Sequence, residues 1–361
     1  MTFVDLLPLV MFSALAVLLF SGYPVAWVLG GLGIAFGAIG MHFGVFSFIE
    51  YFNIVSRLWG TAAESLILVA VPMFIFMGTM LERSGVANDL LHCLQVLLRR
   101  TPGGLALSVT IMGTIMAATT GIIGASVVMM TLLALPVMLD RGYHVPLATG
   151  TIAASGTLGI LIPPSIMLVI MADLLSISVG TLFLAAVLPG LTLAGLYLVY
   201  IYTRTSINPS LAPPLPDDIG PANRAELWTM VLRSFVPPIL LIVFVLGSIF
   251  AGWATPTEAA GVGALGALLL AIANRKLNWR VLKDVSERSA LTIGMIFGIF
   301  IGATAFSYVY RSLGGDDLVH HYVTQAALGS WGLLIMMMVL VFLLGFFFDW
   351  IEITLIVLPL F

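Results

Sequence analysis

The chain has 361 residues, of which 61% are hydrophobic and 9% charged, and its mean hydropathy is +1.15. Soluble domains carry about 25% charged residues, so the composition indicates an all-α polytopic membrane protein. Apolar runs recur along nearly the whole chain and leave no room for a sizeable soluble catalytic domain, nor does any pattern indicate a nucleic-acid partner. The single cysteine, Cys93, excludes an intrachain disulfide and a cysteine metal cluster.

Hydropathy predicts membrane spans at about 5–21, 24–41, 61–81, 145–171, 176–203, 233–250, 256–273 and 289–310. Two half-length apolar segments, 103–118 and 126–139, are too short to cross separately and predict a re-entrant hairpin over 103–139. With the N-terminus periplasmic, every basic residue except Arg57 and Arg311 then falls on the cytoplasmic side. This distribution agrees with the positive-inside rule.

Two segments, 42–60 and 277–290, are amphipathic rather than spanning, and they predict arm helices that lie along the membrane surface. Ordinary interfacial loops are the alternative. Residues 206–223 are rich in proline and polar residues and predict a cytoplasmic linker. This linker divides the chain into two parts, 1–205 and 224–361.

The two parts resemble each other in sequence. The segment at 22–33 matches that at 254–266, residues 82–91 match 310–319, and GASVVMMTLLALP at 124 matches FFDWIEITLIVLP at 347. Five spans precede the linker, so the second copy would run inverted, which is typical of secondary transporters. The chain stops within the second hairpin, 330–361, and we expect it to be a fragment whose second repeat is incomplete.

The first candidate site is TTGIIGAS, residues 119–126, in the middle of the first hairpin. Gly121 and Gly124 allow positive backbone dihedrals, and a broken helix leaves carbonyls and amides unpaired. Those carbonyls, with the hydroxyls of Thr119, Thr120 and Ser126, suit a hard cation such as Na⁺, while free amides suit an anion. The alternative is a small-residue packing face.

The second candidate site is GTLGILIPPS, residues 156–165. Pro163 and Pro164 remove two amide donors from the middle of an apolar span, and the freed carbonyls need partners such as a bound cation. The alternative is a proline kink satisfied by a neighbouring Ser or Thr.

Asp349 and Glu352 are the pair of acids placed deep in an apolar segment. Each costs roughly 2.5 to 3.5 kcal/mol at a bilayer centre, so they are expected to face protein, water or an ion. The functional interpretation is Na⁺ coordination or proton coupling. The alternative is that this turn lies near the membrane surface and is simply solvated.

The residues quoted above resemble the large membrane subunit of the tripartite ATP-independent periplasmic (TRAP) transporter family. The resemblance rests on PMFIFMG at 72, TTGIIGAS, ALPVMLDRGY at 134, ATGTIAASGTLGILIPPS at 148, TPTEAAGVGA at 255 and DWIEITLIVLP at 349. It covers essentially the full chain. The early stop departs from the family's pattern, because family members continue with another broken helix.

The resemblance implies Na⁺-driven uptake of an organic acid by an elevator motion in the bacterial inner membrane. Its expected partners are a small four-helix membrane subunit, a periplasmic solute-binding protein and membrane lipid, with Na⁺ as coupling ion and no organic cofactor. It places Thr120, Gly121, Gly124, Ser126, Thr157 and Ser165 at the solute, and Thr119, Ser126, Gly156, Pro163, Asp349 and Glu352 at Na⁺.

Two other functions remain open at this point. One is a single-component Na⁺/carboxylate symporter with the same inverted-repeat plan. The other is an intramembrane enzyme using Asp349 and Glu352, although no Ser-His, metal-ligand or paired-aspartate pattern accompanies them. Dicarboxylates, 2-oxo acids, sugar acids and sialic acids all fit as the solute.

Overall fold

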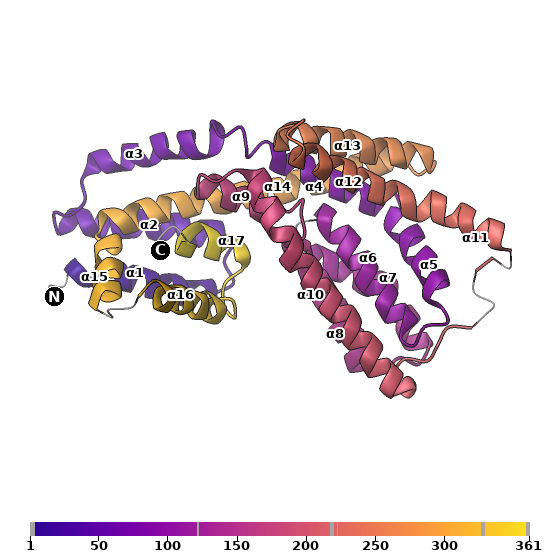
Figure 1. The fold of residues 1–361 in the computed structure, drawn as a ribbon. Coiled ribbons are helices and arrows are strands. Elements are labelled where there is room, and N and C mark those ends of the chain that lie inside the picture. Colours follow the sequence, from indigo (N-terminus) through magenta and orange to yellow (C-terminus); the bar gives the residue numbers. More distant parts are fainter. Residues whose placement is uncertain (1–3, 121–122, 217–219, 222, 326–328, 359–361) are drawn as a thin grey trace. The chain divides into compact units, whose positions relative to one another are not determined.

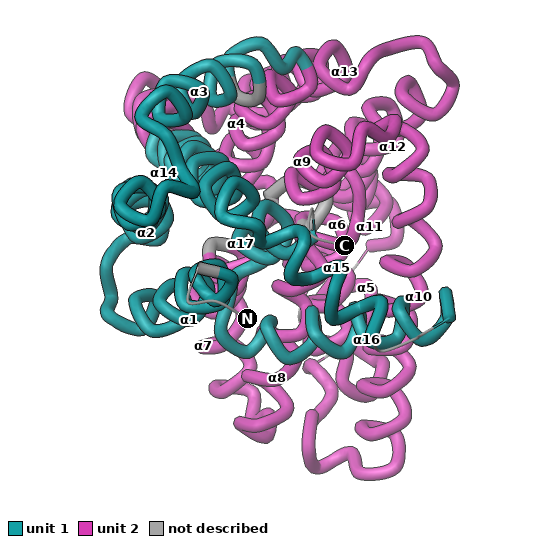
Figure 2. The backbone as a smooth tube through the Cα atoms, turned by 90° about the vertical axis from the view of Figure 1, so that its left-hand side faces the viewer, with its two compact units in different colours: residues 1–66, 291–361 teal, residues 67–290 magenta. Residues whose placement is uncertain are grey.

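The computed structural model describes residues 4–120, 123–216, 220, 221, 223–325 and 329–358, and every regular element among them is helical (Figure 1). The chain forms two compact units (Figure 2). Unit 1 comprises residues 1–66 and 291–361, and unit 2 comprises residues 67–290. Each unit therefore combines residues from both predicted repeat copies, and the repeat boundaries stay a prediction.

Unit 1 contains six α-helices, the last part of a seventh and two π turns among its described residues. They are α1 (Leu7–Leu19), α2 (Val25–His42), α3 (Phe48–Leu58), the π turn Trp59–Ala63, the end of α14 (Trp279–Ser312), α15 (Gly315–Gln325), α16 (Ser330–Leu344), α17 (Trp350–Glu352) and the π turn Ile353–Val357. Helices α2 and α14 approach closely through glycine. A Cβ on Gly302 would lie 2.5 Å from the carbonyl oxygen of Ala26, a contact only a small residue permits.

The predicted first arm is confirmed as a helix, α3, within the range 42–60. Its polar side chains reach Tyr308 of α14: the Asn53 amide donates to the Tyr308 hydroxyl at 3.3 Å, and the Arg57 guanidinium lies 5.3 Å from the ring centre. Its large apolar side chains stay exposed, namely Phe48, Ile49, Phe52 and Val55. This distribution is expected of a helix bordered by lipid.

Unit 2 is built around α6, which packs against α4, α5, α7, α8 and α10. Its elements are α4 (Ala70–Arg83), α5 (Val86–Leu98), α6 (Gly104–Thr120), α7 (Ile123–Asp140), α8 (Val145–Thr157), the 3-10 turn Leu158–Ile160, α9 (Ile166–Leu174), α10 (Val179–Ile207), the 3-10 turn Pro209–Leu211, α11 (Arg224–Met230), the π turn Val231–Phe235, α12 (Val236–Phe250), α13 (Pro256–Ala273) and the start of α14. Helix α13 packs on α4 and α12. The two hairpin helices and the broken helix thus share one core.

Among the described residues, five helical segments are long and apolar enough to cross a membrane: Val25–His42, Val179–Ile207, Arg224–Phe250, Pro256–Ala273 and Trp279–Ser312. Two boundaries differ from the sequence prediction. The predicted arm at 277–290 and the span at 289–310 form one continuous helix, α14, because no helix-breaking residue separates them. The predicted span at 61–81 is helical from Ala70 onward, after a π turn and irregular chain.

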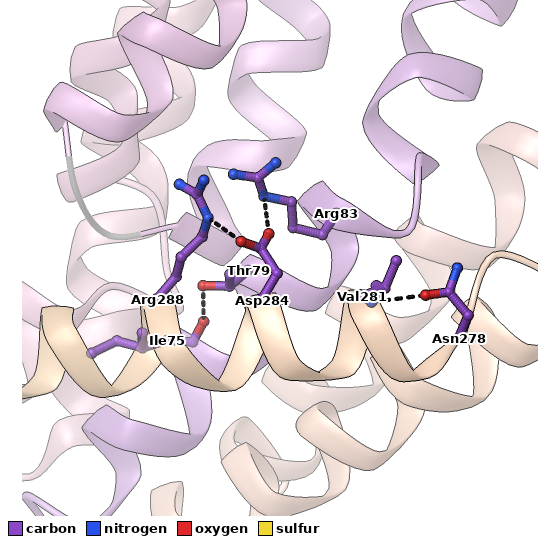
Figure 3. Close-up of polar contacts among 7 residues, drawn as sticks. All are labelled: Ile75, Thr79, Arg83, Asn278, Val281, Asp284 and Arg288. Atoms are coloured by element: carbon purple, nitrogen blue, oxygen red, sulfur yellow. Dashed lines mark hydrogen bonds and ion pairs between the residues drawn. The ribbon is translucent and has the colours of Figure 1, made fainter.

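The start of α14 is fixed to α4 by a charge cluster (Figure 3). The Asp284 carboxylate accepts from Arg83 at 3.1 Å and from Arg288, one turn further along α14, at 3.0 Å. Asn278 begins the helix by accepting the backbone N–H of Val281 at 2.9 Å. Glu82, the neighbour of Arg83, is half-buried, and burial raises its pKa above the usual value against the opposing effect of the two arginines.

Candidate functional site

The segment of the predicted hairpin, 103–139, forms two packed helices, α6 and α7, and its re-entrant course in the membrane stays a prediction. Its two ends are joined by a buried hydrogen bond, in which the Tyr143 hydroxyl accepts the backbone N–H of Leu105 at 3.1 Å. Burial raises the pKa of Tyr143 above its ordinary value, so this hydroxyl stays neutral. One tyrosine thereby fixes the start of α6 to the chain that follows α7.

The hairpin tip carries the TTGIIGAS residues. Gly121 and the side chains of Thr119 and Thr120 lie outside the described residues. Gly124 lies in the first turn of α7, with no positive φ and no atom within 4 Å of where a Cβ would stand. Gly124 does not use the positive dihedral that glycine allows, because α7 already begins at Ile123. Ser126, in contrast, is 2% exposed and lies inside unit 2.

The second predicted break is confirmed between α8 and α9. Helix α8 ends at Thr157, a short 3-10 turn follows, and residues 161–165 have no helical structure before α9 begins at Ile166. The Pro163–Pro164 peptide bond is cis. The break interrupts the backbone hydrogen bonding of an otherwise apolar segment, as the two prolines predict.

The hydroxyls beside the break are bonded to the backbone. Ser165 is fully buried and donates to the carbonyl of Ile160 at 2.7 Å, across the break. Thr157 donates to the carbonyl of Ala154 at 2.8 Å. Ser165 thus satisfies one freed carbonyl, as the alternative interpretation of a locally satisfied kink requires. Each hydroxyl oxygen keeps lone pairs that can still accept a hydrogen bond or contact a cation.

The hairpin and the broken helix touch at positions that need small residues. A Cβ on Gly156 of α8 would lie 2.2 Å from Cγ2 of Val127 on α7. A Cβ on Gly113 of α6 would lie 2.8 Å from that of Ser155 on α8. The residue of α7 that meets Gly156 is Val127, which directly follows Ser126 in the chain. Gly113 and Ser155 were not predicted, although small residues inside long apolar helices are the signal that marks such contacts.

The two acids of the second matched segment differ from each other. Asp349 is exposed, and its carboxylate accepts the backbone N–H of Trp350 at 2.8 Å as the cap of α17. Glu352 is 3% exposed, and its Oε2 atom has no hydrogen-bond partner among the described residues. A buried carboxylate oxygen without a partner requires a proton or a cation. Glu352 is therefore the acid whose surroundings fit an ion.

The described residues contain no group of three or more His, Cys, Asp or Glu side chains that could hold a metal ion. A cation in unit 2 would depend on carbonyl and hydroxyl oxygens. Such neutral oxygen ligands suit a weakly charged hard cation. The donor set at Ser126, Gly156, Thr157, Pro163 and Ser165 is of this neutral kind.

Comparison with known proteins gives one consistent result. The family model "Tripartite ATP-independent periplasmic transporter, DctM component" matches residues 12–361. A C4-dicarboxylate TRAP transporter large permease protein of Rhodobacter capsulatus is 31% identical over 368 residues, which cover 98% of this chain and 80% of that protein. A permease of the same description from Pseudomonas aeruginosa is 31% identical over 314 residues, covering 86% and 71% respectively.

A third relative has another solute in its name. It is the isethionate TRAP transporter permease protein DctMQ of Oleidesulfovibrio alaskensis, 30% identical over 365 residues that cover 99% of this chain and 54% of that protein. The family match and these identities confirm the resemblance seen in the sequence motifs. The chain belongs to the tripartite ATP-independent periplasmic transporter family as its DctM component, the large membrane permease subunit.

Proposed function

We propose that this permease imports a small organic anion, that Na⁺ drives the import, and that an elevator motion carries the solute. As a TRAP large permease, the chain is a transport subunit for an organic acid and not an enzyme, and it works with a small membrane subunit and a periplasmic binding protein. We further place it in the inner membrane with a periplasmic N-terminus, which the distribution of basic residues supports.

The class of solute is supported by chemistry that two relatives share. Their names contain C4-dicarboxylate and isethionate, which are both small organic anions. A helix that begins inside an apolar core presents unpaired amides and the positive end of its dipole, and α9 begins this way after Ser165. An anionic group of the solute would be stabilised there, with Ser165, Thr157, Ser126 and the tip residues Thr120, Gly121 and Gly124 around it.

The observation that carries the proposal is the interrupted helix at 158–165 packed against the hairpin at Gly156. A break of this kind costs backbone hydrogen bonds in an apolar setting, and it is typical of sites where carbonyls hold an ion. Carbonyl oxygens at Gly156 and Pro163, with the hydroxyls of Ser126 and Thr119, would hold one Na⁺. Glu352, with its unpartnered oxygen, would contribute to Na⁺ binding in the second segment, with Asp349 beside it.

Reconstitution of the permease with its small subunit in liposomes, with the binding protein outside, tests the proposal. Labelled succinate and labelled isethionate are supplied with an inward Na⁺ gradient, then with K⁺ replacing Na⁺. We expect uptake of one of the acids that requires Na⁺, the binding protein and the small subunit together. Equal uptake in K⁺ would contradict the proposed Na⁺ coupling. Uptake by the permease alone would indicate a single-component symporter.

A further inference from the structure

A half-open cavity of about 490 Å³ lies in unit 2, and none of its lining residues belongs to the hairpin tip. One wall is a face of α8 that includes Gly150, Thr151 and Ser155, and the opposite wall is a face of α10 that includes Tyr197 and Arg204. Both helices pack on α6, so α6 closes the space between them. Cavities of this size hold small molecules.

The α8 wall contains a buried hydroxyl that lacks a partner. Thr151 is 5% exposed, and its Oγ1 atom forms no hydrogen bond with any described residue. Next to it, Ser155 donates to the Thr110 hydroxyl at 3.3 Å, and both of these residues also line the cavity. Because buried hydroxyls in native proteins are nearly always bonded, the Thr151 hydroxyl indicates a polar group bound in the cavity.

The charge of the cavity indicates the sign of that ligand. Arg204, in the last turn of α10, and His144, which directly precedes α8, line the same space. No acidic side chain is among the described residues that line the cavity. A guanidinium is always charged and binds carboxylates well, so the cavity favours an anion over a cation or a neutral apolar molecule.

We propose that this cavity binds a small hydroxy acid, with its carboxylate at Arg204 and His144 and its hydroxyl at Thr151. The site is separate from the proposed transport site, because none of its lining residues belongs to the hairpin tip or to the break at 158–165. Its occupant therefore binds without Na⁺. This independence separates the two proposals, since loss of Na⁺-coupled uptake leaves binding here intact.

The first test is calorimetry on the permease in phosphatidylcholine nanodiscs, with choline replacing Na⁺. L-Malate, which has a hydroxyl, is compared with succinate, which lacks it. We expect malate to bind, and Thr151→Val to weaken malate binding about 3- to 10-fold, the usual contribution of one hydrogen bond, while succinate is unaffected. Thr151→Ser restores the hydroxyl and malate binding, and Arg204→Gln weakens both acids about tenfold or more.

A cavity-filling variant provides the control for folding. Gly150 lines the cavity and has no atom within 4 Å of where a Cβ would stand, so a side chain can begin there, and we expect Gly150→Leu to fill the cavity and abolish binding. Gly195→Leu, on α10 but outside the cavity and equally unobstructed, should leave binding unchanged. Malate binding that survives both Gly150→Leu and Arg204→Gln, or no binding of either acid, would overturn the proposal. So would binding that disappears when phosphatidylglycerol is added to the nanodiscs, because the site would then take an anionic lipid headgroup.

Discussion

The hairpin of unit 2 and the matched segment of unit 1 differ in how they treat polar groups. In unit 2 the hairpin is held against α8 by glycine contacts, and the hydroxyls of Ser165 and Thr157 are bonded to backbone carbonyls. In unit 1 the segment after α16 places one acid at an exposed helix cap and buries the other, Glu352, with an unpartnered oxygen. The region in unit 2 therefore presents neutral oxygen atoms to an ion, whereas the segment in unit 1 presents an ionisable carboxyl group.

The difference matters because the two kinds of group respond differently to an ion. Neutral hydroxyls and carbonyls contribute little free energy to the binding of a cation. Those that are already hydrogen-bonded also tolerate its absence. A buried carboxylate with an unpartnered oxygen is costly, and a proton or a cation at that oxygen lowers the cost. We therefore expect Glu352 to carry more of the Na⁺ dependence than Ser126, Ser165 or Asp349.

The largest expected effect comes from the packing of the first region. Gly156→Val introduces a branched side chain where a Cβ alone would lie 2.2 Å from Cγ2 of Val127, so α7 and α8 must separate. We expect the free energy of unfolding to fall by about 3 kcal/mol or more. Gly150→Ala, one and a half turns earlier on α8, meets no atom within 4 Å and should stabilise the helix by about 1 kcal/mol. Thermal unfolding in detergent compares the two variants. Equal shifts in their unfolding temperatures would contradict the close approach of α7 and α8 at Gly156.

The second prediction concerns the two acids. Glu352→Gln removes the charge that needs a counter-ion, and we expect the Na⁺ concentration for half-maximal uptake to rise about tenfold, about 1.4 kcal/mol of Na⁺ binding. Asp349→Asn keeps a good helix cap and should change Na⁺ activation much less. Uptake at graded Na⁺ concentrations in reconstituted liposomes measures both. A larger effect from Asp349→Asn would reverse the assignment of the two acids.

The third prediction concerns the break itself. Ser165→Ala removes the hydrogen bond to the buried carbonyl of Ile160, and we expect it to cost about 1 to 2 kcal/mol in thermal stability. Thr157→Ala removes a bond to the carbonyl of Ala154 within one helix, at a half-buried position, and should cost less than about 0.5 kcal/mol. If the two variants unfold at the same temperature, Ser165 does not stabilise the break.

The local features of the fold could be predicted from the sequence. The hairpin helices, the α8–α9 break and the amphipathic helix α3 follow from proline positions and from the spacing of apolar residues, and each of these elements is present among the described residues. The family followed from the same motifs, with the break residues Pro163 and Ser165 among them. These features depend on residues close together in the chain.

What the sequence could not give depends on contacts between distant residues. Nothing near Gly156 in the chain indicates that Val127 lies against it, and nothing near Asp349 and Glu352 indicates that one is exposed and the other buried. The continuity of α14 across 290 also escaped, because charge patterning marks a face of a helix and not its end. The division into two compact units also differs from the predicted repeats, because each unit contains residues from both repeats.

The smallest expected effect concerns Glu82, an acid whose charge two arginines influence. Glu82 lies in the charge cluster with Arg83, Asp284 and Arg288, yet burial raises its pKa above the usual 4.5. A carboxyl whose folded pKa is raised binds its proton more tightly in the folded state, so its contribution to stability is present below about pH 4.5 and is lost as pH rises through the folded value. Glu82→Gln should therefore raise the unfolding temperature slightly at pH 7 and have little effect at pH 4.

The matched control is Glu287→Gln on α14, whose exposed carboxylate lies 3.6 Å from Lys283 and should change stability little at either pH. Unfolding temperatures from pH 4 to 8 in the same detergent compare the two variants with the parent chain. If Glu82→Gln instead lowers the unfolding temperature at pH 7, attraction by Arg83 and Arg288 outweighs burial. Proximity to arginine would then determine how a half-buried acid affects the stability of this fold. The lack of such a partner at Glu352 would then support a bound cation there more strongly.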